Sequence, residues 1–133
     1  MIDLKKYAQF VDGVTSDESK DGDAFTHRIA DLYYQDFDTH RLLTAAVGLC
    51  AESGEFTEII KKIVFQGKPV NDENLWHLKR ELGDVMWYVM QACMGLGVDL
   101  DEVIEMNIDK LKSRYPGGEF DAHYSENRKQ GDL

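Results

Sequence analysis

Two long stretches of helical periodicity, separated by one short break, constrain the fold of this chain more than any other feature. Residues 40–66 and 72–96 repeat apolar side chains at three- and four-residue intervals, as amphipathic helices do. Asp38 or Thr39 is expected to cap the first helix, and Asn71 or Asp72 the second. Between them stands QGKPV, residues 66–70, where glycine and proline stop a helix. Because a short connection favours antiparallel neighbours, the sequence predicts a long helix hairpin.

The other segments also repeat with a helical period, so the predicted fold class is all-α. Shorter helices are expected over residues 2–12, 24–37 and 100–115, with a loop over 15–23 and a polar tail at the end. The 133 residues fit a single domain. We expect N-terminal helices over about 1–38, the helical core over 39–115 and a C-terminal tail over 116–133.

Charge and composition exclude several classes of partner. The net charge of −10 argues against nucleic acid, because phosphate backbones require patches of Lys and Arg. No signal peptide is recognisable, and no apolar run approaches the ~20 residues that span a bilayer. Cys50 and Cys93 form no CxxC pair and are expected to be buried free thiols. The sequence therefore predicts a cytoplasmic protein without a nucleic-acid or membrane partner.

Two short segments of the predicted hairpin are near copies of each other. LCAESGEF, residues 49–56, and LKRELGDV, residues 78–85, both read L-x-x-E-x-G-acid-apolar. Each places two acids three residues apart on one helix face, Glu52 with Glu55 and Glu81 with Asp84. Each also places a glycine inside a helix, where it costs about 1 kcal/mol relative to alanine. Both features are locally unfavourable, so their repetition needs a reason.

The spacing of the two segments supplies that reason. Glu55 and Glu81 each lie 13 residues from Lys68 at the break, and Glu52 and Asp84 each lie 16 residues from it. In an antiparallel hairpin both segments then stand roughly 20 Å from the turn, at ~1.5 Å per residue. Four carboxylates meet at one place. The glycines allow close approach of the helices or leave room beside the acids for a metal-bound ligand.

A divalent cation is the expected occupant of this place. Four neighbouring carboxylates cannot all stay ionised without a counter-charge, and Mg²⁺ prefers oxygen ligands. Neither segment contains histidine, which favours Mg²⁺ or Mn²⁺ over iron. The alternative is a solvated acidic face, since 25 acids produce such pairs by chance and Glu55 forms another with Glu58. The matched glycines and mirrored spacing favour the metal site.

Three longer stretches carry a resemblance to a known family. LLTAAVGLCAESGEFTEIIKKIVFQGKP, RELGDVMWYV and NIDKLKSRYPGGEF resemble the MazG-like all-α nucleoside triphosphate pyrophosphohydrolases, over about residues 40–128. E-x-x-E followed about 25 residues later by E-x-x-D is that family's defining motif. The resemblance implies a four-helix core completed by dimerisation.

The resemblance also implies an activity, the cleavage of a nucleoside triphosphate to the monophosphate and pyrophosphate. Catalysis and Mg²⁺ binding would fall to Glu52, Glu55, Glu81 and Asp84, with one of them or Glu58 as general base. Phosphoribosyl-ATP and alarmones are alternative substrates. A non-catalytic metal-binding helical module is the alternative from another class. The long hairpin is expected to associate as a homodimer or homotetramer, because short flanking helices leave apolar faces exposed.

Further positions carry over from the resemblance as substrate-binding candidates. They are Lys61, Lys62, Tyr88, Asn107, Lys110 and Arg114. The last three share one face of the final helix, which alternatively is a solvated basic flank near a helix C-terminus. Met86, Met90 and Met94 are expected in the core, and the four histidines show no shared spacing.

Overall fold

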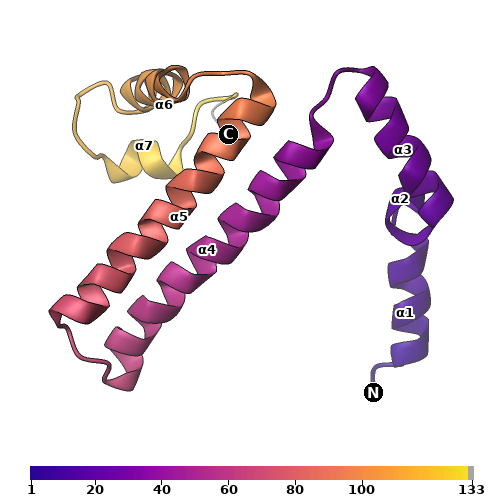
Figure 1. Ribbon diagram of the computed structural model, residues 1–133, viewed down its shortest axis with the longest axis horizontal. Helices are drawn as coiled ribbons and strands as arrows, with labels where there is room; N and C mark the ends of the chain where they lie inside the picture. The colour runs from indigo at the N-terminus through magenta and orange to yellow at the C-terminus, as the bar shows by residue number, and fades with distance from the viewer. Residues whose placement is uncertain (132–133) are drawn as a thin grey trace. The chain divides into compact units, whose positions relative to one another are not determined.

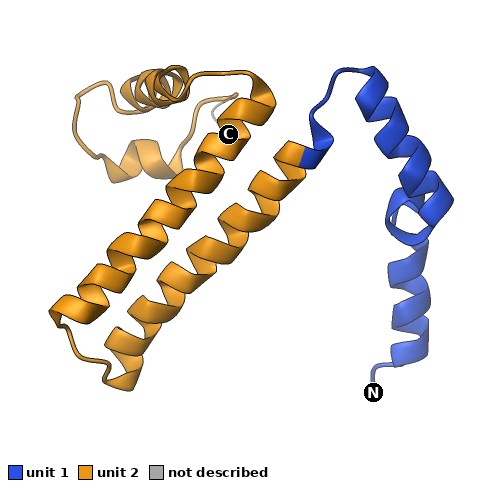
Figure 2. Ribbon diagram, viewed as in Figure 1, with its two compact units in different colours: residues 1–40 blue, residues 41–133 orange. Residues whose placement is uncertain are grey.

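The computed structural model describes residues 1–131, and within that range it contains helices and no strand. The chain divides into two compact units, residues 1–40 and 41–133 (Figure 2). No helix among the described residues is long and apolar enough to cross a membrane. The predicted all-α fold class is confirmed. The helices are α1 (Leu4–Gly13), α2 (Asp17–Lys20), α3 (Gly22–Tyr34), α4 (Thr39–Gln66), α5 (Asp72–Leu96), α6 (Leu100–Arg114) and α7 (Ala122–Glu126), as labelled in Figure 1.

The first unit holds three helices and corrects one prediction. The loop expected over residues 15–23 is wrong in its middle, where Asp17–Lys20 form the short helix α2, and at its end, where α3 already begins at Gly22. This helix has acids in its first turn and Lys20 in its last, which suits the helix dipole at both ends. The Asp21 carboxylate then accepts a hydrogen bond from the backbone N–H of Ala24 at 2.7 Å and caps α3. The prediction of a single domain, with helices over about 1–38, stays a prediction.

The predicted hairpin is confirmed in the second unit. Helices α4 and α5 run antiparallel and side by side, with bounds within one residue of those expected (Figure 1). Gly67 adopts φ +70°, a left-handed conformation that ends α4. Of the two cap candidates for α5, Asn71 is the cap, since its side-chain oxygen accepts from the backbone N–H of Asn74 at 2.9 Å. Asn74 is buried and donates to the Pro69 carbonyl at 2.8 Å, which fixes the turn against the helix.

Close contacts hold the two long helices at a defined separation. The ring of Tyr88 on α5 lies directly against Gly48 of α4, where any Cβ would overlap the ring. Gly48 is therefore the residue of α4 that permits this approach. Toward the other end, the Arg41 guanidinium donates to the Gln91 side-chain oxygen at 2.8 Å. These contacts bring α4 and α5 close together in the middle of the hairpin, where both acidic segments lie.

Each of the two units buries few apolar side chains by itself. Among the described residues, Ala45 and Cys93 are the only buried hydrophobic side chains. The prediction of core positions for three methionines of α5 is wrong within the unit that holds the hairpin, because each side chain is about half exposed there. Cys93 is a buried free thiol as expected, whereas Cys50 is exposed, contrary to the prediction. The three methionines and their exposed fractions are Met86 (50%), Met90 (47%) and Met94 (58%).

The C-terminal part of the second unit folds back after a break. α6 ends at Arg114, one residue before the Tyr-Pro-Gly-Gly sequence that stops it. The polar tail then contains a helix, α7, that the sequence pattern did not predict. The Asp121 carboxylate caps it by accepting from the backbone N–H of His123 at 2.8 Å. The described part of the tail thus contains one helix, and its Lys129 contacts the last turn of α6.

Candidate metal centre and substrate groove

Three of the four predicted carboxylates meet in the middle of the hairpin. Glu52 and Glu55 project from α4, and Glu81 projects from α5. One oxygen from each of them lies within 4.8 Å of the others. Glu55 and Glu81 lie equally far along the chain from the turn at Lys68. In two antiparallel helices, residues equally far from the turn lie side by side, and the acids therefore meet. The carboxylates are partly exposed, so a ligand can reach them from solvent.

The fourth acid, Asp84, lies at the edge of this cluster. It does not join the group of three oxygens, and it is exposed. It nevertheless lines a surface groove with Glu52, Trp87 and Tyr88, and its charge acts on Glu52. Asp84 is therefore a neighbour of the three-carboxylate cluster through Glu52.

The electrostatics of Glu52 fit a cation-binding role. Partial burial raises the pKa of Glu52 above the ordinary 4.5, and the nearby charges of Asp84, Glu55 and Glu81 raise it further. When Glu52 is ionised, its negative charge is repelled by those of Asp84, Glu55 and Glu81. Carboxylate oxygens that converge without a compensating charge are the ligand set that hard divalent cations take up. The donor atoms present fit Mg²⁺ or Mn²⁺.

The two glycines of the acidic segments lie in open space. A Cβ added at Gly54 or Gly83 would meet no other atom within 4 Å. Close approach of the helices is therefore the wrong explanation for these two positions, and Gly48 has that role instead. The other explanation was that these glycines leave room beside the acids for a metal-bound ligand, and the open space at Gly54 and Gly83 agrees with it.

A groove of about 510 Å³ extends from the cluster along the hairpin toward the turn. Glu55 and Glu81 line it together with Lys62, Lys68 and His77. Lys68 and His77 were not among the residues predicted from the sequence to bind metal or substrate. His77 stands four residues before Glu81, which places both on one face of α5, and that spacing was the available signal. The groove therefore offers cationic and imidazole groups beside the acids.

Lys61 and Lys62 both bind Glu58 in this structure. The ammonium of Lys61 lies 2.5 Å from one Glu58 oxygen, and that of Lys62 lies 3.1 Å from the other. Hydrogen bonds from Lys61 and then Lys62 hold the pKa of Glu58 below its ordinary value. Of the two lysines, Lys62 lines the groove of Glu55 and Glu81.

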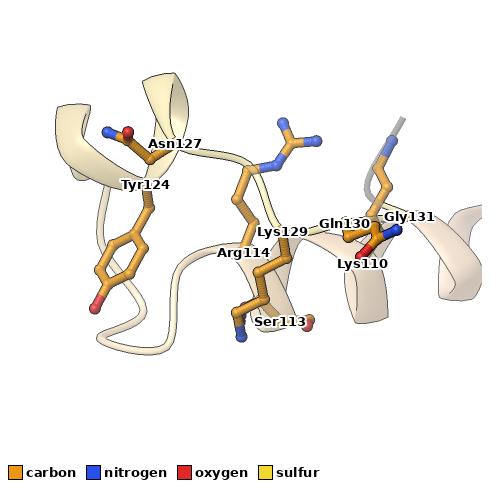
Figure 3. A pocket seen from close by; sticks show the side chains of 8 residues that line it. All are labelled: Lys110, Ser113, Arg114, Tyr124, Asn127, Lys129, Gln130 and Gly131. Carbon is orange, nitrogen blue, oxygen red and sulfur yellow. Dashed lines mark hydrogen bonds between the residues drawn. The ribbon is translucent and has the colours of Figure 1, made fainter.

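The predicted basic face on α6 forms a separate feature. Lys110 and Arg114 line a pocket between α6 and the tail, whereas Asn107 lies on the same helix outside that pocket (Figure 3). None of the three lines the groove of Glu55 and Glu81. Tyr88 does border the acids, since it shares its groove with Glu52 and Asp84.

Comparison with known proteins identifies the class to which this hairpin and its acids belong. Residues 39–118, more than half of the chain, match the MazG nucleotide pyrophosphohydrolase domain. The chain belongs to this family, whose activity is the hydrolysis of nucleotide pyrophosphates.

One relative is the Gene 37 protein of Mycobacterium phage L5, with 44% identity over 73 residues, or 54% of this chain. The aligned part spans 64% of that relative, less than two thirds of its length. No solved structure matches the chain significantly.

The raised pKa of Glu52 predicts how stability changes with pH in the absence of metal. A carboxyl whose pKa is raised on folding destabilises the folded state increasingly as pH rises above 4.5. We expect Glu52→Gln to match the wild-type melting temperature near about pH 4 and to exceed it at about pH 7. The opposite influence of Glu58 is present in both proteins and cancels in the difference.

Thermal unfolding followed by circular dichroism with EDTA, in buffers between those two pH values, measures this difference. Added Mg²⁺ is expected to raise the melting temperature of the wild type more than that of the variant. A difference between the two proteins that stays constant with pH contradicts the electrostatic account of the cluster.

Proposed function

We propose that this protein is a Mg²⁺-dependent nucleoside triphosphate pyrophosphohydrolase that acts in nucleotide pool control or sanitation. The observation that carries the proposal is the convergence of Glu52, Glu55 and Glu81 inside the segment that matches the family. The reaction consumes one water. The bond between the α and β phosphates breaks, the water oxygen forms the new P–O bond, and a nucleoside monophosphate and pyrophosphate leave.

The four acids divide this work between metal binding and proton transfer. Glu52, Glu55, Glu81 and Asp84 hold Mg²⁺, or Mn²⁺ in its place. A bound divalent cation neutralises phosphate charge and lowers the pKa of a bound water. The proposed general base is one of these four acids or Glu58, which lines the groove beside Glu55 and Glu81.

Substrate binding is proposed for residues on both sides of the acids. Lys62 faces the groove and is favoured over Lys61 as a phosphate ligand, although it must first leave Glu58. Tyr88 packs on Gly48 and borders Glu52, where its ring can contact the sugar or base. The remaining proposed substrate-binding residues are Asn107, Lys110 and Arg114 of α6.

Association of two copies is part of the proposal. Leu82, Met86, Met90 and Met94 follow each other at four-residue intervals on α5 and share one face. All four are about half exposed or more, although the Met94 sulfur accepts a hydrogen bond from the Arg41 guanidinium of α4 at 3.7 Å. An apolar stripe of this length in a chain with so little buried surface is typical of an interface. We propose that a second hairpin covers it in a homodimer with a four-helix core.

The experiment that tests the activity is a substrate panel. Purified protein is incubated with canonical (d)NTPs, oxidised or deaminated analogues and phosphoribosyl-ATP, with Mg²⁺, with Mn²⁺ and with EDTA. We expect pyrophosphate and the monophosphate in equal amounts from at least one nucleotide, and no turnover with EDTA. Absence of hydrolysis across the panel in the presence of both metals would sink the proposal.

A further inference from the structure

The groove that runs from the acids toward the turn of the hairpin differs in charge at its two ends. Glu55 and Glu81 line the end at the three-carboxylate cluster. Lys62, Lys68 and His77 line it nearer the turn. A ligand with several negative charges can therefore reach the acids through a bound cation and continue onto positive groups within the same groove.

His77 lies one helical turn from the acids. It precedes Glu81 by four residues on α5, a separation of ~6 Å along the helix axis at ~1.5 Å per residue. The linked phosphoryl groups of a triphosphate extend over a comparable length. The imidazole is half-buried and lines the groove, and one of its ring nitrogens can donate a hydrogen bond to a phosphate oxygen.

The end of α4 places Lys68 beside the same groove. Gly67 adopts φ +70°, which turns the chain back after the last helical residue. The backbone N–H of Lys68 then donates a hydrogen bond to the Lys62 carbonyl at 3.1 Å. This bond ties the residue after the glycine to the last turns of α4, and the Lys68 side chain lines the groove from there.

Of the two lysines in the groove, only Lys68 has a charge that no acid of the described residues takes up. The Lys62 ammonium already lies 3.1 Å from a Glu58 oxygen. Lys68 is half-buried and makes no ion pair with any residue between 1 and 131. A partly desolvated charge without a partner is unfavourable, and an anionic ligand removes that penalty.

We propose that Lys68 and His77 bind the terminal phosphate of a nucleoside triphosphate and make the protein prefer triphosphates to diphosphates. The inference rests on the proposed function, which places the α and β phosphates at the metal cluster. The nucleoside then lies on the other side of the acids, where Tyr88 borders Glu52, and the third phosphate points toward the turn. A diphosphate ends at the cluster and does not reach Lys68.

Steady-state hydrolysis of a nucleoside triphosphate and of its diphosphate measures this preference. Lys68→Ala should lower kcat/KM for the triphosphate roughly tenfold, as expected for loss of one charge-assisted hydrogen bond. The value for the diphosphate should fall much less, and Lys68→Arg should keep most of the preference. His77→Ala should show the same pattern with a smaller loss. Lys79→Ala is the matched control, since Lys79 is exposed on α5 and does not line the groove.

Binding measurements decide the inference separately from the enzymatic proposal. Hydrolysis-resistant α,β-imido analogues of the canonical dNTPs and of their diphosphates are titrated calorimetrically into the full-length protein with Mg²⁺. We expect tighter binding of a triphosphate analogue than of its diphosphate, and loss of most of that difference in Lys68→Ala.

Equal binding of both analogues by the wild type overturns the inference even if the enzyme hydrolyses nucleotides. Absence of binding, or equal effects of Lys68→Ala and Lys79→Ala, also overturns it. A triphosphate preference in binding that depends on Lys68, in a protein without hydrolytic activity, keeps the role of Lys68 and overturns the proposed function.

Discussion

Replacing Glu55 with glutamine is expected to lower the turnover of the preferred nucleotide by roughly 100-fold or more, the usual scale when one group that stabilises transition-state charge is lost. The amide keeps the size of the side chain and removes the charge. Glu55 contributes one of the three oxygens that lie within 4.8 Å of each other. Steady-state pyrophosphate release at saturating Mg²⁺ measures the loss.

A second readout separates a metal ligand from a merely structural residue. Mn²⁺ binding, followed by electron paramagnetic resonance of the free ion, should weaken in Glu55→Gln. Glu105→Gln removes an exposed acid of α6 and serves as the matched control with unchanged turnover and Mn²⁺ binding. Turnover by Glu55→Gln at the wild-type rate would remove Glu55 from the proposed site.

Two glutamates placed in the apolar stripe of α5 are expected to convert the proposed dimer into monomers. Met86→Glu combined with Met90→Glu puts charges on two side chains that are each about half exposed in the single chain. Each unpaired charge buried in an interface costs several kcal/mol, and a symmetric dimer of the double variant would bury four of them, so association should fail. Size-exclusion chromatography with light scattering measures the mass of wild type and variant.

The control for this experiment is Met106→Glu, which changes an exposed methionine on α6 instead of α5. It should elute with the wild type. A wild-type protein that elutes as a monomer at all concentrations contradicts the proposed association. Unchanged mass of the double variant places the interface on another surface of the hairpin.

The hairpin and the convergence of its acids were predictable because both follow from regular geometry. A helical period of known rise, one stop signal and the equal spacing of Glu55 and Glu81 from Lys68 fix which side chains reach the same level. The preference of Asn and Asp for helix starts gave Asn71 and Asp72 as two cap candidates for α5, and only the structure shows that Asn71 is the cap. The predicted roles of the site residues in metal binding and catalysis stay predictions, although three of the four acids do come together.

The features that were not predicted depend on contacts between segments distant in sequence. The pocket between α6 and the tail exists because the tail returns to α6, and no periodicity encodes that return. Gly48 carries no local mark that distinguishes it from Gly54, and only the ring of Tyr88 on the neighbouring helix separates their roles. The three methionines of α5 have the spacing of a core face. Spacing alone does not distinguish a surface buried within one chain from a surface buried between two.

Within each unit the apolar core is small, since Ala45 and Cys93 are the only buried apolar side chains among the described residues. The proposed dimer would therefore link folding to protein concentration. When most apolar surface is buried only on association, folding and assembly become one equilibrium, and the melting temperature rises with protein concentration. Dilution then removes folded molecules and not merely pairs. If the proposed dimer and the proposed activity both hold, a cell that makes more of this chain gains activity more than proportionally at low expression, because each new copy also stabilises those already present.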